Sequence, residues 1–432
     1  QYALRRAEVF SGAVTRGGFG ADVGVARSRS DGSARNGDHD FSRASLRLQV
    51  RSAAAQTDAA IGYQEKRFGW TNLYTPFGSA ESENLQTLLL ALNHRASAGG
   101  DTTWEAGAFH RRNKDDYAFN RFAPVGPVHP FQHTTWVTGG AAEARWRRAE
   151  WTVAARGEAQ TDRITSTSLT FGRYRSRVLT KATATAEREW AAEAGRGTLR
   201  FGISRDDSDR DGGRWLPMAE LAREFTGGAL RAVRLGYAAT SQLPGYTALN
   251  ASPSSGLFRG NAALGRSVSR NLEVGANLSL AGWSVEAAAF TRWDDALVDW
   301  TFRRGVTART AAAVDVRVAG LEWVARRTWG RFDAVIGHTW LGKDADYRGA
   351  TVDASFYALN HARHRLTAAL TARLTPRTDL RVDNSFRQQA PNLLRTIGGD
   401  RALHTAVGLH HRPAALRGLE LAVQVEIGRA HV

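Results

Sequence analysis

Stretches of about ten residues with alternating apolar and polar side chains run from one end of this chain to the other. Leu46, Leu48 and Val50, for example, alternate with Arg47 and Gln49. A period of two places the apolar side chains on one face of a β-strand and the polar ones on the other. About ten residues is also the length that a tilted strand needs to cross a bilayer. The pattern therefore predicts an all-β protein, a transmembrane antiparallel β-barrel. Similar alternation occurs at 199–204, 272–279, 366–372 and 419–425.

The connections between these stretches alternate between short and long, and the brief, charged connection at 208–213 is the exception. Outer-membrane barrels have short periplasmic turns and longer external loops, so this alternation predicts which end of each strand faces the cell exterior. Five tryptophans lie within a few residues of the short turns, where an interfacial girdle is expected: Trp146, Trp151, Trp190, Trp283 and Trp329. The expected strands number about twenty and cover 2–13, 18–28, 42–54, 57–67, 85–97, 102–113, 133–147, 149–158, 175–190, 197–207, 214–225, 229–241, 269–280, 283–293, 309–327, 331–343, 361–374, 378–389, 402–412 and 416–426.

Composition excludes several other classes of protein. No apolar run approaches the length of about eighteen residues that a transmembrane helix requires. The net charge of +16 comes from 58 Lys and Arg residues that are spread over strands and loops, which argues against nucleic acid as a partner and favours a lumen that attracts anions. The absence of cysteine fits folding in an oxidising periplasm without disulfides.

The strand pattern is continuous, so we expect one partial barrel domain over 1–426. The last six residues, 427–432, break off a strand without a turn signal and are similar to a translated sequencing adapter. We predict that they are a non-native tail, and a genuine polar tail is the alternative. The first residue is Gln1 and the first strand begins at once, so both ends of the chain look truncated.

Four stretches of the sequence resemble the barrel domain of TonB-dependent outer-membrane receptors, in particular those for cobalamin and siderophores. The most specific is 237–275, with Ser-Gln-Leu-Pro-Gly-Tyr at 241–246, Gly-Leu-Phe-Arg-Gly-Asn at 256–261 and Ser-Arg-Asn-Leu-Glu-Val-Gly at 269–275. The others are 4–8, the 68–76 segment with Phe-Gly-Trp and Tyr-Thr-Pro, and 109–134 with Phe-His-Arg-Arg-Asn. The sequence departs from the family pattern at 242–244, where Gln-Leu-Pro replaces Arg-Ala-Pro, and at Ala262, which replaces a proline.

The resemblance implies a barrel of about twenty-two strands around an N-terminal plug. About twenty strands here correspond to that barrel less one strand at each end, with the plug domain absent. The resemblance also implies location in the outer membrane of a Gram-negative bacterium, with outer-membrane lipid and the TonB energy-transducing complex as partners, the latter through the missing plug. The implied function is active uptake of a bulky, scarce nutrient such as a ferric siderophore or cobalamin. A passive outer-membrane pore or secretion barrel is the alternative.

The expected long loops carry aromatic side chains together with arginine, which can hold a bulky small-molecule or metal-chelate substrate through stacking and charge. Packing of these aromatic residues on one another is the structural alternative. The candidate ligand-binding residues are Trp70, Tyr74, Phe77, Tyr117, Arg121, Tyr246, Phe258 and Arg259.

Asp31, Asp38 and Asp40 share one expected loop, and their carboxylates could hold Ca²⁺, although their spacing matches no strict calcium-binding loop. We expect no other cofactor. His404 and His410 are predicted to share one face of a strand and His411 the other, in lumenal or interfacial positions. Nothing in the sequence links Ser, His and an acid into a catalytic triad, so we predict that the protein is not an enzyme.

Overall fold

The computed structural model describes residues 3–14, 17–32, 34–75, 77–123, 131–355, 361–391, 399–415 and 418–430. Within these ranges the chain forms 22 β-strands and one short α-helix. Only β13 (Phe258–Arg259) and β18 (Ala354–Ser355) have two residues, and the other twenty described strands have ten or more, which confirms the expected strand content. In the described ranges no helix has both the length and the apolar character needed to cross a membrane.

The twenty long strands have the following bounds. They are β1 (Arg5–Val14), β2 (Phe19–Ser30), β3 (His39–Arg51), β4 (Ala55–Thr71), β5 (Ala80–Ser97), β6 (Thr102–Ala118), β7 (Phe131–Arg148), β8 (Trp151–Ser166), β9 (Ser176–Ala192), β10 (Gly195–Ser208), β11 (Asp211–Phe225), β12 (Leu230–Gln242), β14 (Ser267–Leu280), β15 (Trp283–Phe302), β16 (Arg309–Trp329), β17 (Phe332–Asp346), β19 (Ala362–Thr375), β20 (Thr378–Gln389), β21 (Arg401–His411) and β22 (Leu421–Ala430). The helix α1 (Tyr246–Asn250) lies between β12 and β13 and was not expected from the sequence.

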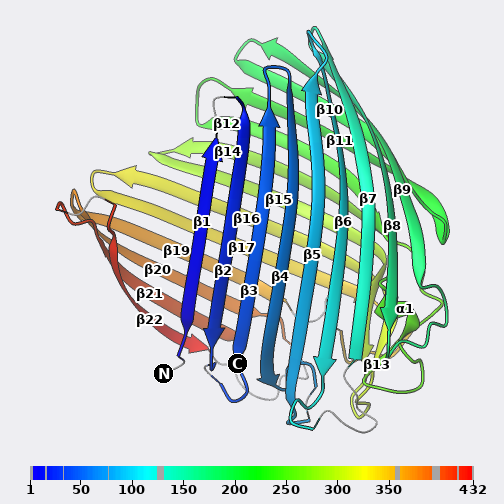
Figure 1. The fold of residues 1–432 in the computed structure, drawn as a ribbon. Helices are drawn as coiled ribbons and strands as arrows, with labels where there is room; N and C mark the ends of the chain where they lie inside the picture. The colour runs from blue at the N-terminus through cyan, green and yellow to red at the C-terminus, as the bar shows by residue number, and fades with distance from the viewer. Residues whose placement is uncertain are drawn as a thin grey trace. The chain divides into compact units, whose positions relative to one another are not determined.

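The chain divides into two compact units. The first comprises Gln1–Ala186, Gly202–Trp215 and Gly245–Ala263, and the second comprises Glu187–Phe201, Leu216–Pro244 and Leu264–Val432. In the first unit, β1 to β8 pair antiparallel in chain order, and the short turns and the long connections lie at opposite ends of these strands (Figure 1). In the second unit, the long strands from β14 to β22 also pair antiparallel with their neighbours in the chain.

The register places the apolar side chains of neighbouring strands in common rows. Leu46 of β3 pairs with Ile61 of β4, and Ile61 pairs with Leu90 of β5. All three side chains are exposed, which is the reverse of a water-soluble sandwich, where such residues form the core. We call the face that carries this row the apolar face of the first unit, and the opposite one its polar face.

Tryptophans cluster on the apolar face near the short turns, as expected for an interfacial girdle. Trp146 and Trp151 flank the β7–β8 turn and are exposed. In the second unit, Trp283 and Trp329 lie with ring centroids 6.3 Å apart, beside two other short turns. The ring of Trp190 covers Gly197, where any side chain would collide with it.

Several strand ends differ from the expectation. The sequence predicts strands at 57–67, 85–97 and 102–113, whereas β4 ends at Thr71, β5 begins at Ala80 and β6 ends at Ala118. The expected length was set by the thickness of a bilayer, but backbone pairing does not depend on side-chain polarity and continues into the polar segments that follow. The predicted start of the last strand at 416 is also wrong, because Gly418 has a φ of +84° and β22 begins only at Leu421. This strand runs through residues 427–430, and the non-native origin of 427–432 stays a prediction, with 431–432 outside the described residues.

Candidate functional site

The loop ends of β4, β5 and β6 bring an acidic and aromatic cluster together on the polar face of the first unit. Trp70 of β4 pairs with Glu81 of β5, and Glu83 of β5 pairs with Tyr117 of β6. Strand alternation therefore places these four side chains on one face, with Asp115 two residues from Tyr117 on the same side. None of the acidic members of this cluster was singled out from the sequence, although the Glu-x-Glu spacing at 81–83 is a signal that could have indicated it.

Glu81 fastens the loop between β4 and β5 to the strand. Its side chain is 0 % exposed. One carboxylate oxygen accepts hydrogen bonds from the Tyr74 amide at 2.7 Å and the Tyr117 hydroxyl at 2.8 Å. The other accepts from the Thr75 amide at 3.1 Å and from the Thr75 hydroxyl. A buried carboxylate with this many donors is satisfied, so its role is to fix the position of the loop that carries Tyr74.

Tyr74 is held a second time through its hydroxyl, which donates to Glu83 at 2.5 Å. Burial of the phenol, followed by its hydrogen bond to Glu83, raises the pKa of Tyr74 above its usual value. The hydroxyl therefore stays protonated and donating at any physiological pH. The Tyr74 ring also contacts the Tyr117 ring edge to face, with centroids 5.5 Å apart.

Arg121 and Asp38 join two further connections to the same end of the sheet. The Arg121 guanidinium donates to Asp38 at 2.6 Å. Gly69 makes room for this contact, because a Cβ there would lie 2.6 Å from Arg121 Nη1. The Trp70 ring lies against Gly37 at the neighbouring position, where a Cβ would lie 3.1 Å from the indole. The loop 31–38 and residue 121 are thereby fixed beside Trp70.

Three of the predicted aromatic residues remain available to a ligand. Trp70 is 43 % exposed, Tyr74 is 44 % exposed and Phe77 is 56 % exposed, although each is held by its neighbours. Phe77 contacts Phe119 with ring centroids 6.1 Å apart. Tyr117, by contrast, stacks on Phe131 at 5.8 Å and donates its hydroxyl to Glu81. The structure thus brings five of the predicted residues, Trp70 to Arg121, to one end of neighbouring strands.

The other three predicted residues belong to the α1–β13 segment, and Tyr246 is buried there. The Tyr246 hydroxyl donates to Asp162 of β8, whose carboxylate also accepts from Arg177 at 2.9 Å. Burial and the bond to Asp162 raise the pKa of Tyr246 above its usual value. In Figure 1, α1 lies beside the loop end of β8, in agreement with these contacts. This geometry makes Tyr246 an anchor for the segment, and its contact with a ligand stays a prediction, as it does for Phe258 and Arg259 on β13.

Asn250, which the sequence did not single out, joins α1 to the β8–β9 connection. Its buried side chain accepts from the Arg173 amide at 3.0 Å and donates to the Tyr174 carbonyl at 3.2 Å. Its carbonyl accepts from the Thr170 amide at 2.9 Å and the Thr170 hydroxyl at 3.0 Å. Asp162 and Asn250 together fix this segment to β8 and to the β8–β9 connection.

Two of the three aspartates considered for calcium are paired with arginines. Asp38 is paired with Arg121, and Asp40 accepts from Arg27 at 2.7 Å and 3.2 Å. Among the described residues, no group of three or more His, Cys, Asp and Glu side chains is arranged to hold a metal ion. A calcium site at Asp31, Asp38 and Asp40 therefore stays a prediction that this geometry does not support.

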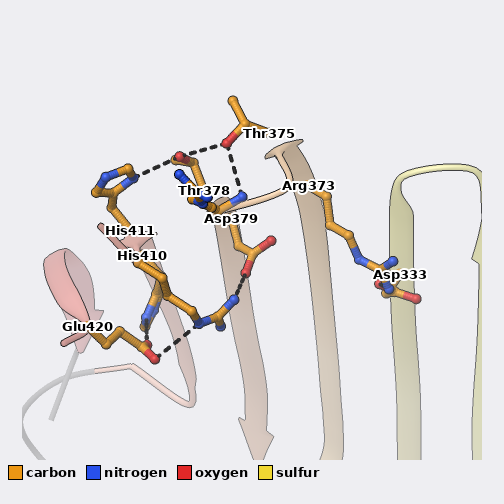
Figure 2. A network of polar contacts seen from close by, with 10 residues as sticks. Asp333, Arg373, Thr375, Thr378, Asp379, His410, His411 and Glu420 are labelled. Atoms are coloured by element: carbon orange, nitrogen blue, oxygen red, sulfur yellow. Dashed lines mark hydrogen bonds and ion pairs between the residues drawn. The ribbon is translucent and has the colours of Figure 1, made fainter. Parts of the chain in front are cut away.

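The histidines near the end of the sequence belong to β21 of the second unit, with His410 and His411 at its end before the connection to β22. His404 and His410 pair with Ser385 and Asp379, while His411 pairs with Thr378 on the opposite face, as the alternation predicts. Figure 2 shows Glu420 beside His410, whose Nδ1 lies 2.9 Å from the carboxylate. The Nε of Arg412 lies 3.4 Å from the same carboxylate. These groups form an exposed polar network at the turn.

Comparison with known proteins identifies related barrels. The family model described as "TonB dependent receptor-like, beta-barrel" matches residues 4–399. The ferric enterobactin receptor of Pseudomonas aeruginosa, in a mutant form bound to enterobactin, is similar over 99% of this chain and 73% of its own, with 14% identity and a TM-score of 0.77.

Two further solved structures show the same fold. The FrpB iron transporter of Neisseria meningitidis is similar over 98% of this chain and 74% of its own, with 12% identity and a TM-score of 0.71. The copper transporter OprC is similar over 99% and 74%, with 13% identity and a TM-score of 0.73. No curated protein matches the sequence. Identities this low establish the fold and leave the ligand open.

Proposed function

Because this chain belongs to the TonB-dependent receptor-like β-barrel family, we propose that it forms the barrel of an active outer-membrane transporter for a bulky, scarce nutrient. The family consists of outer-membrane receptors and transporters of Gram-negative bacteria and is not a family of enzymes. The proposed substrate is a metal chelate such as a ferric siderophore, or cobalamin. Energy would come from a TonB complex acting through a plug domain. The passive pore is not favoured by the family match.

The observation that carries this proposal is the group of exposed aromatic residues on rigid supports. Trp70, Tyr74 and Phe77 each present a ring at the loop ends of the first unit. Glu81 and Glu83 hold the backbone and hydroxyl of Tyr74, so little conformational entropy is lost when a ligand stacks on it. Aromatic anchors that are already in position are typical of sites for large, flat or polycyclic ligands.

The proposal can be tested by ligand titration of the refolded chain in detergent, with tryptophan fluorescence as the readout. The panel would contain ferric enterobactin, a ferric hydroxamate siderophore, ferric citrate and cyanocobalamin. We expect one member to quench the fluorescence saturably, and Trp70→Ala to weaken its binding about tenfold, as loss of an aromatic anchor does. Trp146→Ala, on the apolar face at the short-turn end, is the matched control and should leave the dissociation constant unchanged. Equal binding by both variants, or none by any panel member, would contradict the proposed site.

Energy coupling needs a separate measurement in cells that carry the complete gene. Uptake of the ligand found in the titration should stop when TonB is deleted or the proton gradient is collapsed. Uptake that continues in both conditions would identify the passive pore instead. Enrichment of iron or copper without dependence on TonB would count against active transport in the same way.

A further inference from the structure

Toward the loop ends of β6, β7 and β8, the apolar face of the first unit carries a row of arginine and tryptophan side chains. Arg112 of β6 pairs with Trp136 of β7, and Trp136 pairs with Arg163 of β8. Arg112 also pairs with Leu88 of β5, two residues from Leu90, so the row belongs to the apolar face. On β8, exposed Arg163 stands between Asp162 and Ile164, which are buried on the opposite face. We call Arg112, Trp136 and Arg163 the Arg-Trp-Arg row.

The position of this row along the membrane normal can be estimated from β7 alone. Trp136 and Trp146 lie on the same face of the strand and are ten residues apart. Ten residues at about 3.3 Å each span about 33 Å along the strand, and a tilt of about 40° reduces this to about 25 Å along the membrane normal. About 25 Å is the height of the apolar band between the two aromatic girdles of an outer-membrane barrel. With Trp146 at the periplasmic girdle, Trp136 lies at the outer one, and the two arginines lie at the level of the outer-leaflet headgroups.

The arginines of the row have no acidic partner in the described ranges. Arg163 lies 4.8 Å above the Trp136 ring. The Nε of Arg112 is buried and makes no hydrogen bond to the described part of the chain. Asp116, on the same face of β6, is paired with Lys114 at 2.8 Å. Elsewhere on the same face the pattern differs, because Arg27 is paired with Asp40 and Arg67 with Glu65, both at 2.7 Å.

We propose that the Arg-Trp-Arg row binds the phosphate of an anionic lipid in the outer leaflet of the membrane. The two arginines stand about 10 Å apart, two strand spacings, and can donate to phosphate oxygens from either side of the indole. Below the row the same face carries one polar row, His110, Thr138 and Thr161. Small and apolar side chains follow it toward Trp146, so acyl chains attached to the phosphate would be covered there as well. Free phosphate matches the arginines alone and gains nothing from that surface. The proposal rests on membership of the barrel family and is independent of the proposed substrate.

The test uses the full chain, refolded in neutral detergent and titrated with phosphatidic acid, with native mass spectrometry as the readout. Phosphatidylcholine and inorganic phosphate form the other two arms. We expect Arg112→Gln/Arg163→Gln to weaken phosphatidic acid binding at least about tenfold, because both cations that attract the charged headgroup are removed. The control Arg27→Gln/Arg67→Gln removes the same charge from the same face, but from arginines already paired with acids, and should change binding less than twofold.

A charge-preserving variant guards against a folding defect. Arg112→Lys/Arg163→Lys should retain most of the binding, and all variants should show the same heat-modifiable mobility on gel electrophoresis. Unchanged binding in the glutamine double variant would overturn the proposal. So would equal affinity for phosphatidylcholine, or competition by inorganic phosphate at concentrations equal to those of the lipid.

Discussion

Two acidic groups of this protein make several polar contacts each and differ chiefly in burial. Glu81, at the loop end of the first unit, is 0 % exposed and accepts from backbone amides and hydroxyls. Glu420, in the connection between β21 and β22 of the second unit, contacts His410 and Arg412 with its side chain 49% exposed. Water can replace the partners of Glu420 but not those of Glu81, so equal losses of hydrogen bonds should have unequal costs. The comparison indicates that buried polar contacts fix the loop that carries Tyr74, while the contacts of Glu420 are open to water.

The largest expected effect lies at the buried ion pair of the loop end. The side chains of Asp162 and Arg177 are only 7% and 14% exposed. Asp162→Asn leaves the guanidinium buried without its counter-charge, and we expect the free energy of unfolding to fall by about 3 kcal/mol. Denaturation by guanidinium chloride in detergent measures this free energy of unfolding. The control is Asp58→Asn, whose partner Arg47 is 47% exposed, and its loss should be under about 1 kcal/mol. Equal losses in the two variants would remove the role that we assign to burial.

Glu81→Gln should have the next largest effect. Glutamine keeps the shape but replaces one acceptor oxygen by a donor that faces the Tyr74 amide or the Thr75 amide. We expect a loss of about 2 kcal/mol, concentrated in the 72–79 loop. Hydrogen exchange of the amides in that loop should accelerate, while exchange in β7 stays unchanged. Glu65→Gln, on the apolar face and bound to Arg67, is the control and should leave the loop protected.

The contact between Arg121 and Asp38 is intermediate, because the two side chains are 24% and 44% exposed. Arg121→Gln should cost about 1 kcal/mol or less and should speed trypsin cleavage in the 31–38 loop. The exchanged pair Asp38→Arg/Arg121→Asp should restore part of the protection, since the attraction is preserved. For this variant protection is measured by hydrogen exchange of the loop amides, because the new arginine is itself a trypsin site. If the exchanged pair were as sensitive as the single variant, charge pairing would not be what holds the loop.

The smallest effect is expected at Glu420 and depends on pH. The hydrogen bond from His410, followed by the charge of Arg412, lowers the pKa of Glu420 below its usual value of 4.5. A lowered pKa means that the stabilisation is present above pH 4.5 and is lost as the pH falls through the lower folded-state pKa. Because the contacts of Glu420 are exposed, Glu420→Gln should lower the urea midpoint of unfolding at pH 7 less than Glu81→Gln does, each relative to the unmodified chain. At a pH below the folded-state pKa of Glu420, the unfolding midpoint of Glu420→Gln should coincide with the midpoint of the unmodified chain. If the difference between the two unfolding midpoints increased as the pH fell, the predicted direction of the pH dependence would be wrong.

The sequence pattern predicted the strands well and the site only in part. Alternation at 46–50 identified the apolar face, because the period of a strand is a local property. Trp70, Tyr74 and Arg121 were proposed because aromatic side chains and arginine in expected long loops can hold a bulky ligand, and their role in binding stays a prediction. Glu81 and Asn250 were missed, because an acid or an amide in a polar stretch reads as solvent-facing until its partners are known. Their donors come from segments between six and about eighty residues away.

The order of apolar and polar residues by itself determined three properties: that this chain forms membrane-crossing strands, which face of each strand is apolar, and which strand ends carry short turns. These properties depend on a two-residue repeat and on a strand length that matches the thickness of a bilayer. Both can be recognised in the sequence of a single strand. Tertiary structure alone decided where the strands end, which acids are buried, and that Arg112, Trp136 and Arg163 form one row. Register between strands sets those neighbours, and register is a property of pairs of strands that no single segment contains.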